Sequence, residues 1–220
     1  MTLNKEIFQR DPTTFSIPND GVTTIAEPRT DEQWAVLRYE LESFVCEGEY
    51  AAGMERVLST FLTHLGQPVQ PAVWVSGFYG SGKSHLVRVL RYLWQDPEFP
   101  DGARARSLRS LPKELDALLR ELSTAGRREG GLWAAAGKME AGQRSIRLSV
   151  IGILFEAAGL PVDYAQGRFV LWLREEGLYD AVVAGLQSQG TTMDDELPNM
   201  NVSTALAQAV SSAEPRMGDS

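Results

Sequence analysis

The feature that most constrains this chain is residues 77–84, Gly-Phe-Tyr-Gly-Ser-Gly-Lys-Ser, which match the pattern G-x-x-x-x-G-K-[ST]. Residues 72–75, Ala-Val-Trp-Val, come just before it and form a continuous apolar run typical of a buried parallel strand. After it, the apolar residues of 86–93 recur at helical spacing. A strand, a glycine-rich loop and a helix in this order predict a loop that binds phosphate.

The residue types of 77–84 fit that chemistry. Glycines let the backbone wrap so that successive N–H groups point at phosphate oxygens, and a helix N-terminus adds a positive end. Lys83 is the predicted catalytic residue, a mobile charge on the β- and γ-phosphates, and the Ser84 hydroxyl is the predicted Mg²⁺ ligand. For Phe78, Tyr79 and His85, the alternative role is packing against the protein rather than contact with a nucleotide. The predicted cofactor-binding residues are Gly77, Phe78, Tyr79, Gly80, Ser81, Gly82, Lys83, Ser84 and His85.

Hydrolysis would need more than this loop. An acidic residue at the end of a second buried strand holds Mg²⁺, and another group orients the attacking water. Residues 169–176 form an apolar run that ends in acids, but Arg174 interrupts it and its apolar spacing favours a helix. The acidic cluster 194–196 has no strand before it. Residues 131–137 are the other predicted strand, so the chain offers only two strands where a sheet has about five or six.

The rest of the chain is predicted to be mostly helical. Apolar residues recur at helical spacing on both sides of Gly48, which indicates a pair of helices. Further helices are expected near 115–122, 145–157 and 163–176, and from 178 onward. The predicted organisation is an extended arm over 1–30, a helical pair over 31–66, the N-terminal part of a nucleotide-binding domain over 67–210, and a frayed tail over 211–220.

Composition excludes several other classes of protein. The 220 residues are 43% apolar and 23% charged, as in an ordinary soluble domain. No apolar run approaches the ~18 residues of a membrane-spanning helix, and the N-terminus lacks the apolar core of a signal peptide, so we expect a cytoplasmic protein without membrane contact. Cys46 is the single cysteine and only two histidines accompany it, which excludes an internal disulfide and a zinc cluster.

Charge is unevenly distributed along the chain. The net charge is −8, yet seven cationic residues lie between Arg104 and Arg128, while eight acidic residues lie from Glu175 onward. A basic stretch of this kind is either a solvated surface or a surface that faces a polyanion such as DNA, or a neighbouring subunit. The cationic residues are Arg104, Arg106, Arg109, Lys113, Arg120, Arg127 and Arg128.

Three parts of the sequence resemble the N-terminal part of a known family. They are residues 4–11, residues 19–22, and residues 73–86, Val-Trp-Val-Ser-Gly-Phe-Tyr-Gly-Ser-Gly-Lys-Ser-His-Leu. Together they are similar to the start of the large P-loop ATPases of bacteriophage-exclusion (BREX) and phage-growth-limitation systems, the BrxC/PglY family. Residues 169–179 also resemble that family.

The resemblance implies an AAA-like ATPase that binds ATP and Mg²⁺ and works with other subunits of a phage-exclusion complex, with a possible homo-oligomer. The implied fold is α/β, a P-loop NTPase with a parallel sheet and flanking helices, incomplete in this chain and preceded by a helical extension. The implied function is nucleotide-dependent assembly or remodelling associated with DNA. Two alternatives are a truncated, non-enzymatic interaction module and a small-molecule phosphotransferase.

Overall fold

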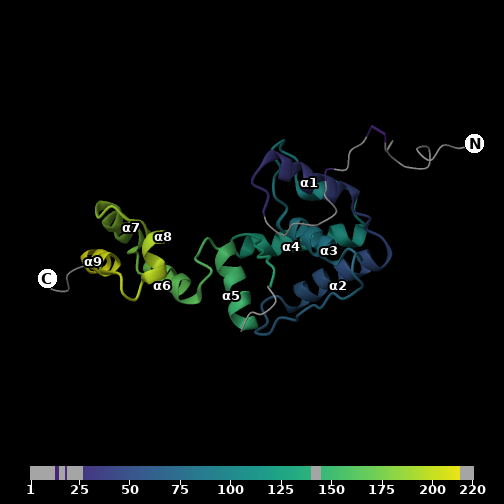
Figure 1. Cartoon of the computed structure of the whole chain (residues 1–220). Helices are drawn as coiled ribbons and strands as arrows, with labels where there is room; N and C mark the ends of the chain where they lie inside the picture. The colour runs from purple at the N-terminus through teal and green to yellow at the C-terminus, as the bar shows by residue number, and fades with distance from the viewer. Residues whose placement is uncertain (1–12, 15–17, 19–26, 140–144, 214–220) are drawn as a thin grey trace, which may run out of the picture. The chain divides into compact units, whose positions relative to one another are not determined.

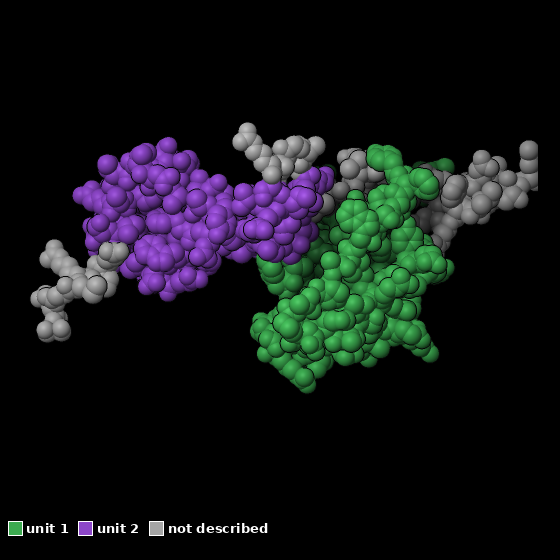
Figure 2. Space-filling model, turned by 90° about the horizontal axis from the view of Figure 1, so that it is seen from below, with its two compact units in different colours: residues 1–134 green, residues 135–220 purple. Residues whose placement is uncertain are grey.

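Two compact units divide the chain, residues 1–134 and residues 135–220 (Figure 2). The computed structural model describes residues 13–14, 18, 27–139 and 145–213. The boundary between the units falls inside the segment 67–210 that the sequence assigns to a single nucleotide-binding domain. Among the described residues, no helix combines the length and the apolar content that crossing a membrane requires.

The first unit is built from four α-helices and a short 3-10 helix within its described residues (Figure 1). Thr30 caps the first of them by accepting a hydrogen bond from the Gln33 N–H, and the Gln33 side chain returns the contact, which fixes the start of the helix. Helix α2 packs on α4, and α3 packs on α1 and α4. The elements are α1 (Asp31–Ser43), α2 (Gly48–His64), α3 (Lys83–Gln95), η2 (Ala105–Ser107) and α4 (Lys113–Arg128).

The core of the first unit is formed by the apolar stripes of these helices. The central parts of the predicted stripes of α2, α3 and α4 face inward, as their helical spacing requires, whereas Tyr50 and Leu65 at the ends of the α2 stripe are exposed. Full burial of a leucine or methionine stabilises the fold by about 1.5–3 kcal/mol each, so these contacts hold the helices together. The most deeply buried side chains are Leu37, Met54, Leu58, Leu115, Leu119 and Leu122.

The second unit is also helical. Ser145 and Asp163 cap α5 and α6 through side-chain oxygens that accept backbone N–H groups. Residues 169–175 belong to α6, which confirms the helical interpretation of that apolar run. Helix α7 packs on α9. The elements are α5 (Ile146–Ala157), α6 (Tyr164–Glu175), α7 (Tyr179–Ser188), α8 (Met193–Glu196), η3 (Leu197–Asn199) and α9 (Thr204–Ala213).

The predicted α/β fold with a parallel sheet is wrong for the part of the chain that the structure describes. These residues form no sheet, and their β-structure is a single isolated bridge between Glu98 and Arg104. Residues 72–75 lie in an irregular segment and are exposed, with Trp74 90% exposed. Residues 132–139 are likewise irregular and span the boundary between the units. Strand propensity needs a neighbouring backbone to pair with, and no described segment pairs with 72–75.

The two ends of the chain lie largely outside the described residues. Of the predicted arm 1–30, the structure describes 13–14, 18 and 27–30, and Glu27 forms an ion pair of 2.5 Å with Arg91 on α3. Residues 4–11 and 19–22, which carry part of the family resemblance, lie outside the described residues. In the predicted tail, residues 211–213 continue α9, and the remainder is outside the described part.

Candidate functional site

The candidate site is the loop formed by residues 77–82 and the first turn of α3. Gly80 and Gly82 both have φ of +79°, a left-handed conformation that glycine adopts without the steric cost of a Cβ. Gly82 is the N-cap of α3, so the second left-handed residue delivers the chain directly into the helix. Glycines thus occupy the two positions of the loop where the backbone turns left-handed before α3.

Lys83 holds the loop closed around its own ammonium group. Its Nζ donates to the carbonyl oxygens of Gly77, at 2.9 Å, and Phe78, at 2.7 Å, and lies 3.5 Å from Ser81 Oγ. A Cβ at Gly77 would stand 2.8 Å from Ser81 Oγ, so a side chain there would require the Ser81 hydroxyl to move. Lys83 and Gly77, two residues of the motif, are therefore in direct contact in the structure.

Several backbone donors of the loop are free. Ser81 N–H donates to Phe78 O at 3.2 Å, but the N–H groups of Gly80, Gly82, Lys83 and Ser84 have no acceptor among the described residues. Helix α3 also lacks a side-chain N-cap. Free donors at a helix N-terminus, next to an ammonium group, form an environment that favours an anion. Since Ser84 is also exposed, its hydroxyl is accessible to a metal ion bound with such an anion.

The aromatic residues predicted beside the loop have two different positions. Phe78 is 91% exposed and Tyr79 is completely exposed, so neither packs on the described part of the chain. His85 instead points into the unit, with its ring 5.4 Å from that of Phe44. Burial, aided by the charge of Arg88, lowers the pKa of His85. This placement favours packing as the role of His85.

A buried ion pair joins α3 to α1 behind the loop. Arg88 Nε lies 2.9 Å from Glu40 Oε2, and both side chains are almost completely buried. Burial raises the pKa of Glu40, and the neighbouring Arg88 charge opposes that rise. An unpaired charge at this depth would be costly, so the two residues fix each other in place. Helix α3, whose first turn belongs to the candidate site, is thereby anchored to α1.

Tyr50 is a contact of the loop that sequence reasoning missed. Its hydroxyl donates a hydrogen bond to the Ser81 carbonyl at 2.5 Å, and its ring packs edge-on against Phe44. In the sequence, Tyr50 is simply the first member of the apolar stripe of α2. Periodicity assigns it to the core, and nothing in the sequence indicates that its hydroxyl reaches a loop 31 positions away.

The acidic residues proposed for hydrolysis are not brought to the loop by any described contact. Glu175 ends α6, Glu176 caps it, and the cluster 194–196 lies in α8, all within the second unit. Within the described ranges, no group of three His, Cys, Asp or Glu side chains is arranged to hold a metal ion. Within the described ranges the loop therefore has no carboxylate partner, and the oxygen that the motif predicts as a Mg²⁺ ligand is the Ser84 hydroxyl.

Two arginines of the basic stretch, Arg106 and Arg109, form hydrogen bonds that connect elements of the first unit. Arg106 donates from Nε to Leu93 O at 2.6 Å and from Nη1 to Leu119 O at 2.9 Å and Ser123 Oγ at 2.6 Å. Burial lowers its pKa. Arg109 donates to Glu42 O at 2.6 Å. These contacts join α3 to α4 and the basic stretch to α1, and they favour structural roles for both residues.

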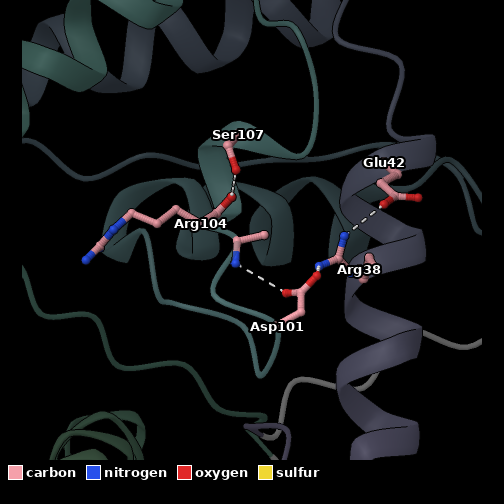
Figure 3. A network of polar contacts seen from close by, with 6 residues as sticks. Arg38, Glu42, Asp101, Arg104 and Ser107 are labelled. Atoms are coloured by element: carbon pink, nitrogen blue, oxygen red, sulfur yellow. Dashed lines mark hydrogen bonds and ion pairs between the residues drawn. The ribbon is translucent and has the colours of Figure 1, made fainter.

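The other arginines of the stretch are more exposed. Arg38, which lies on α1 outside this stretch, forms ion pairs with Glu42 and with Asp101 (Figure 3). The side chain of Arg104 points away from these ion pairs. Arg104 is 59% exposed and lies 3.8 Å from Glu98. On α4, Arg120 pairs with Asp116 at 2.8 Å, one turn away. Arg104 and Arg120 thus each have an acidic neighbour, as on an ordinary solvated surface, whereas Arg127 donates to Thr124 Oγ1 at 3.1 Å.

Comparison with known proteins adds no name to these observations. No protein-family model matches this chain, and no solved structure gives a significant match. The functional assignment therefore depends on the geometry of residues 77–84 and on the chemistry that this geometry permits.

Proposed function

We propose that this chain binds the phosphates of ATP, together with Mg²⁺, at residues 77–84. The observation that carries the proposal is the set of free N–H donors at Gly80, Gly82, Lys83 and Ser84, arranged beside the Lys83 ammonium group. Charge-assisted hydrogen bonds of this type are roughly twice as strong as neutral ones. An anion with several oxygens, such as a triphosphate, can accept from several neighbouring donors at once, which a monatomic anion does less well.

The two side chains of the motif have distinct parts in this binding. Lys83, now on the Gly77 and Phe78 carbonyls, would exchange these neutral acceptors for phosphate oxygens. Ser84, exposed in the first turn of α3, would supply an oxygen to Mg²⁺. Hydrolysis would depend on an acidic residue supplied from outside this loop, because no described carboxylate contacts it.

We place this nucleotide-binding module in a multi-subunit complex of the bacteriophage-exclusion type, in the cytoplasm, where nucleotide binding would control assembly. The motif-bearing segment 73–86 supports this proposal through its resemblance to those ATPases. Exposed apolar side chains flank the loop, and they indicate contact with another protein. The exposed residues are Val73, Trp74, Phe78 and Tyr79.

The direct test is calorimetric titration of Mg-ATP into the full chain, with a phosphate-release assay on the same samples. We expect binding by the wild type, loss of binding in Lys83→Ala, and no phosphate release. Lys113→Ala, which removes an exposed lysine of α4, serves as the control and retains binding. Absence of binding by a folded wild type, or equal binding by Lys83→Ala, would contradict the proposal.

A second candidate function is that of a non-enzymatic interaction module. The exposure of Trp74 and Phe78, at 90% and 91%, favours it, because large apolar side chains are seldom left this open on a monomer without a binding role. Light scattering after size-exclusion chromatography measures self-association directly. Under this function the wild type self-associates without nucleotide, and the double variant Trp74→Ser with Phe78→Ser is a monomer.

A further inference from the structure

Helix α2 reaches the candidate loop through one hydroxyl group. Tyr50, in the first turn of α2, donates its Oη–H to the Ser81 carbonyl oxygen at 2.5 Å. A Cβ built on the next residue, Gly82, would lie 3.1 Å from the same hydroxyl. Tyr50 therefore binds the Ser81 carbonyl and occupies the space beside Gly82, at the point where the loop enters α3.

Because the peptide bond is planar, the hydrogen bond from Tyr50 to the Ser81 carbonyl also fixes the direction of the Gly82 N–H. In a trans peptide the carbonyl of one residue and the N–H of the next point in opposite directions. With the Ser81 carbonyl held by Tyr50, the Gly82 N–H points away from α2, and it is one of the free donors of the loop. Rotation of this peptide would turn that donor and would also break the hydrogen bond to Tyr50.

The tyrosine is itself held by a row of aromatic rings. Phe44 lies between Tyr50 and His85, with ring centroids 6.0 Å from the first and 5.4 Å from the second. Phe44 is buried, whereas Tyr50 is partly exposed. Phe44, the C-cap of α1, therefore contacts both Tyr50, which reaches the loop, and His85 in the first turn of α3.

We infer that Tyr50 is a positioning residue that orients the Gly82 donor of the loop, and that the helical pair of α1 and α2 sets the loop's affinity for phosphate through it. The inference rests on the proposed function for its effect on affinity. A loop held in its binding conformation loses less entropy on binding. Where that conformation is only partly populated, the apparent affinity falls in proportion.

The test compares Tyr50→Phe with the wild type in the full chain, because this change keeps the ring on Phe44 and removes only the hydroxyl. We expect the Gly82 amide nitrogen resonance to move upfield, since the carbonyl before it loses its hydrogen bond. We also expect the Kd for Mg-ATP to rise about fivefold to tenfold, as for the loss of one hydrogen bond. The thermal midpoint should stay near that of the wild type. Tyr164→Phe, the same change in the second unit, should alter none of these.

An unchanged Gly82 resonance together with an unchanged Kd in Tyr50→Phe would overturn the inference. A fall in the thermal midpoint with no change in the Gly82 resonance would also overturn it, because it would show a role in packing alone. If the wild type does not bind Mg-ATP, the proposed function fails. The Gly82 resonance then decides the role of Tyr50 by itself, because it is measured without nucleotide.

Discussion

The loop 77–82 and the segment 72–75 just before it are neighbours in the sequence, yet the structure treats them differently. The loop has left-handed glycines at positions 80 and 82, and the predicted helix follows it at once. The preceding apolar run does not become the expected strand and stays exposed. Left-handed glycines and a helix N-terminus need only local chemistry, whereas a strand needs a partner that is distant in sequence.

The largest expected effect is a difference in the free energy of unfolding between two tryptophan variants, one in the exposed segment 72–75 and one in α3. Trp74→Ala should change the free energy of unfolding by less than about 0.5 kcal/mol, because its side chain is 90% exposed. Trp94→Ala should cost about 3 kcal/mol, because its ring packs 4.5 Å from Phe61 against the core. Urea denaturation measures both. A loss near 3 kcal/mol for Trp74→Ala would show that residues 72–75 are buried in the folded chain.

A pair of glycine variants tests whether the left-handed conformation of the loop is needed for Mg-ATP binding. Gly82→Ala should weaken Mg-ATP binding by about tenfold or more, because φ of +79° strains a residue with a side chain and the new Cβ meets Tyr50. Gly66 has φ of +80° with nothing near its Cβ position, so Gly66→Ala carries the same strain away from the loop. It should bind Mg-ATP as the wild type does. Equal affinities of the two variants for Mg-ATP, measured by calorimetry, would contradict the claim that binding depends on the loop conformation.

A smaller effect is expected from the pH dependence of stability at the first turn of α3. The pKa of His85 is lowered in the folded protein, so below pH 6.5 the unfolded chain binds a proton that the folded chain resists. Its contribution to stability is therefore present above pH 6.5 and decreases as the pH falls below it. Urea titrations at pH 7.5 and pH 5.5 should show a smaller loss of stability in His85→Phe than in the wild type. An equal loss in both proteins would show that His85 is not buried on Phe44.

The smallest effect concerns the backbone of the apolar run. Val73→Pro removes an N–H group, which in a central strand breaks a ladder hydrogen bond. In this structure residue 73 belongs to no strand and is exposed, so the free energy of unfolding should change by less than about 0.5 kcal/mol. A large loss of stability, measured by urea denaturation, would restore the strand that the sequence predicts.

The helices and the loop were accessible to sequence reasoning because both depend on near neighbours. The spacing of Leu115, Leu119 and Leu122 predicts the buried face of α4, and the three are fully buried. The interpretation of 169–176 as a helix was correct for the same reason. In the loop, glycine positions and Lys83 follow from the motif alone.

The remaining features depend on contacts between distant residues. A count of arginines does not distinguish Arg106, which binds three carbonyls and a hydroxyl inside the unit, from the exposed Arg120. The contact between Tyr50 and Ser81 leaves no trace in the periodicity of α2. The sheet was predicted from the propensity of 72–75, and propensity does not supply a partner strand.

The most direct measurement of the central claim is a nitrogen-15 NMR titration of the full chain with Mg-ATP. If the free donors of the loop bind phosphate, the amide resonances of Gly80, Gly82, Lys83 and Ser84 shift, while those of α7 and α9 in the second unit stay in place. Saturation that leaves these four resonances unchanged would contradict the account, whether or not nucleotide binds elsewhere on the chain.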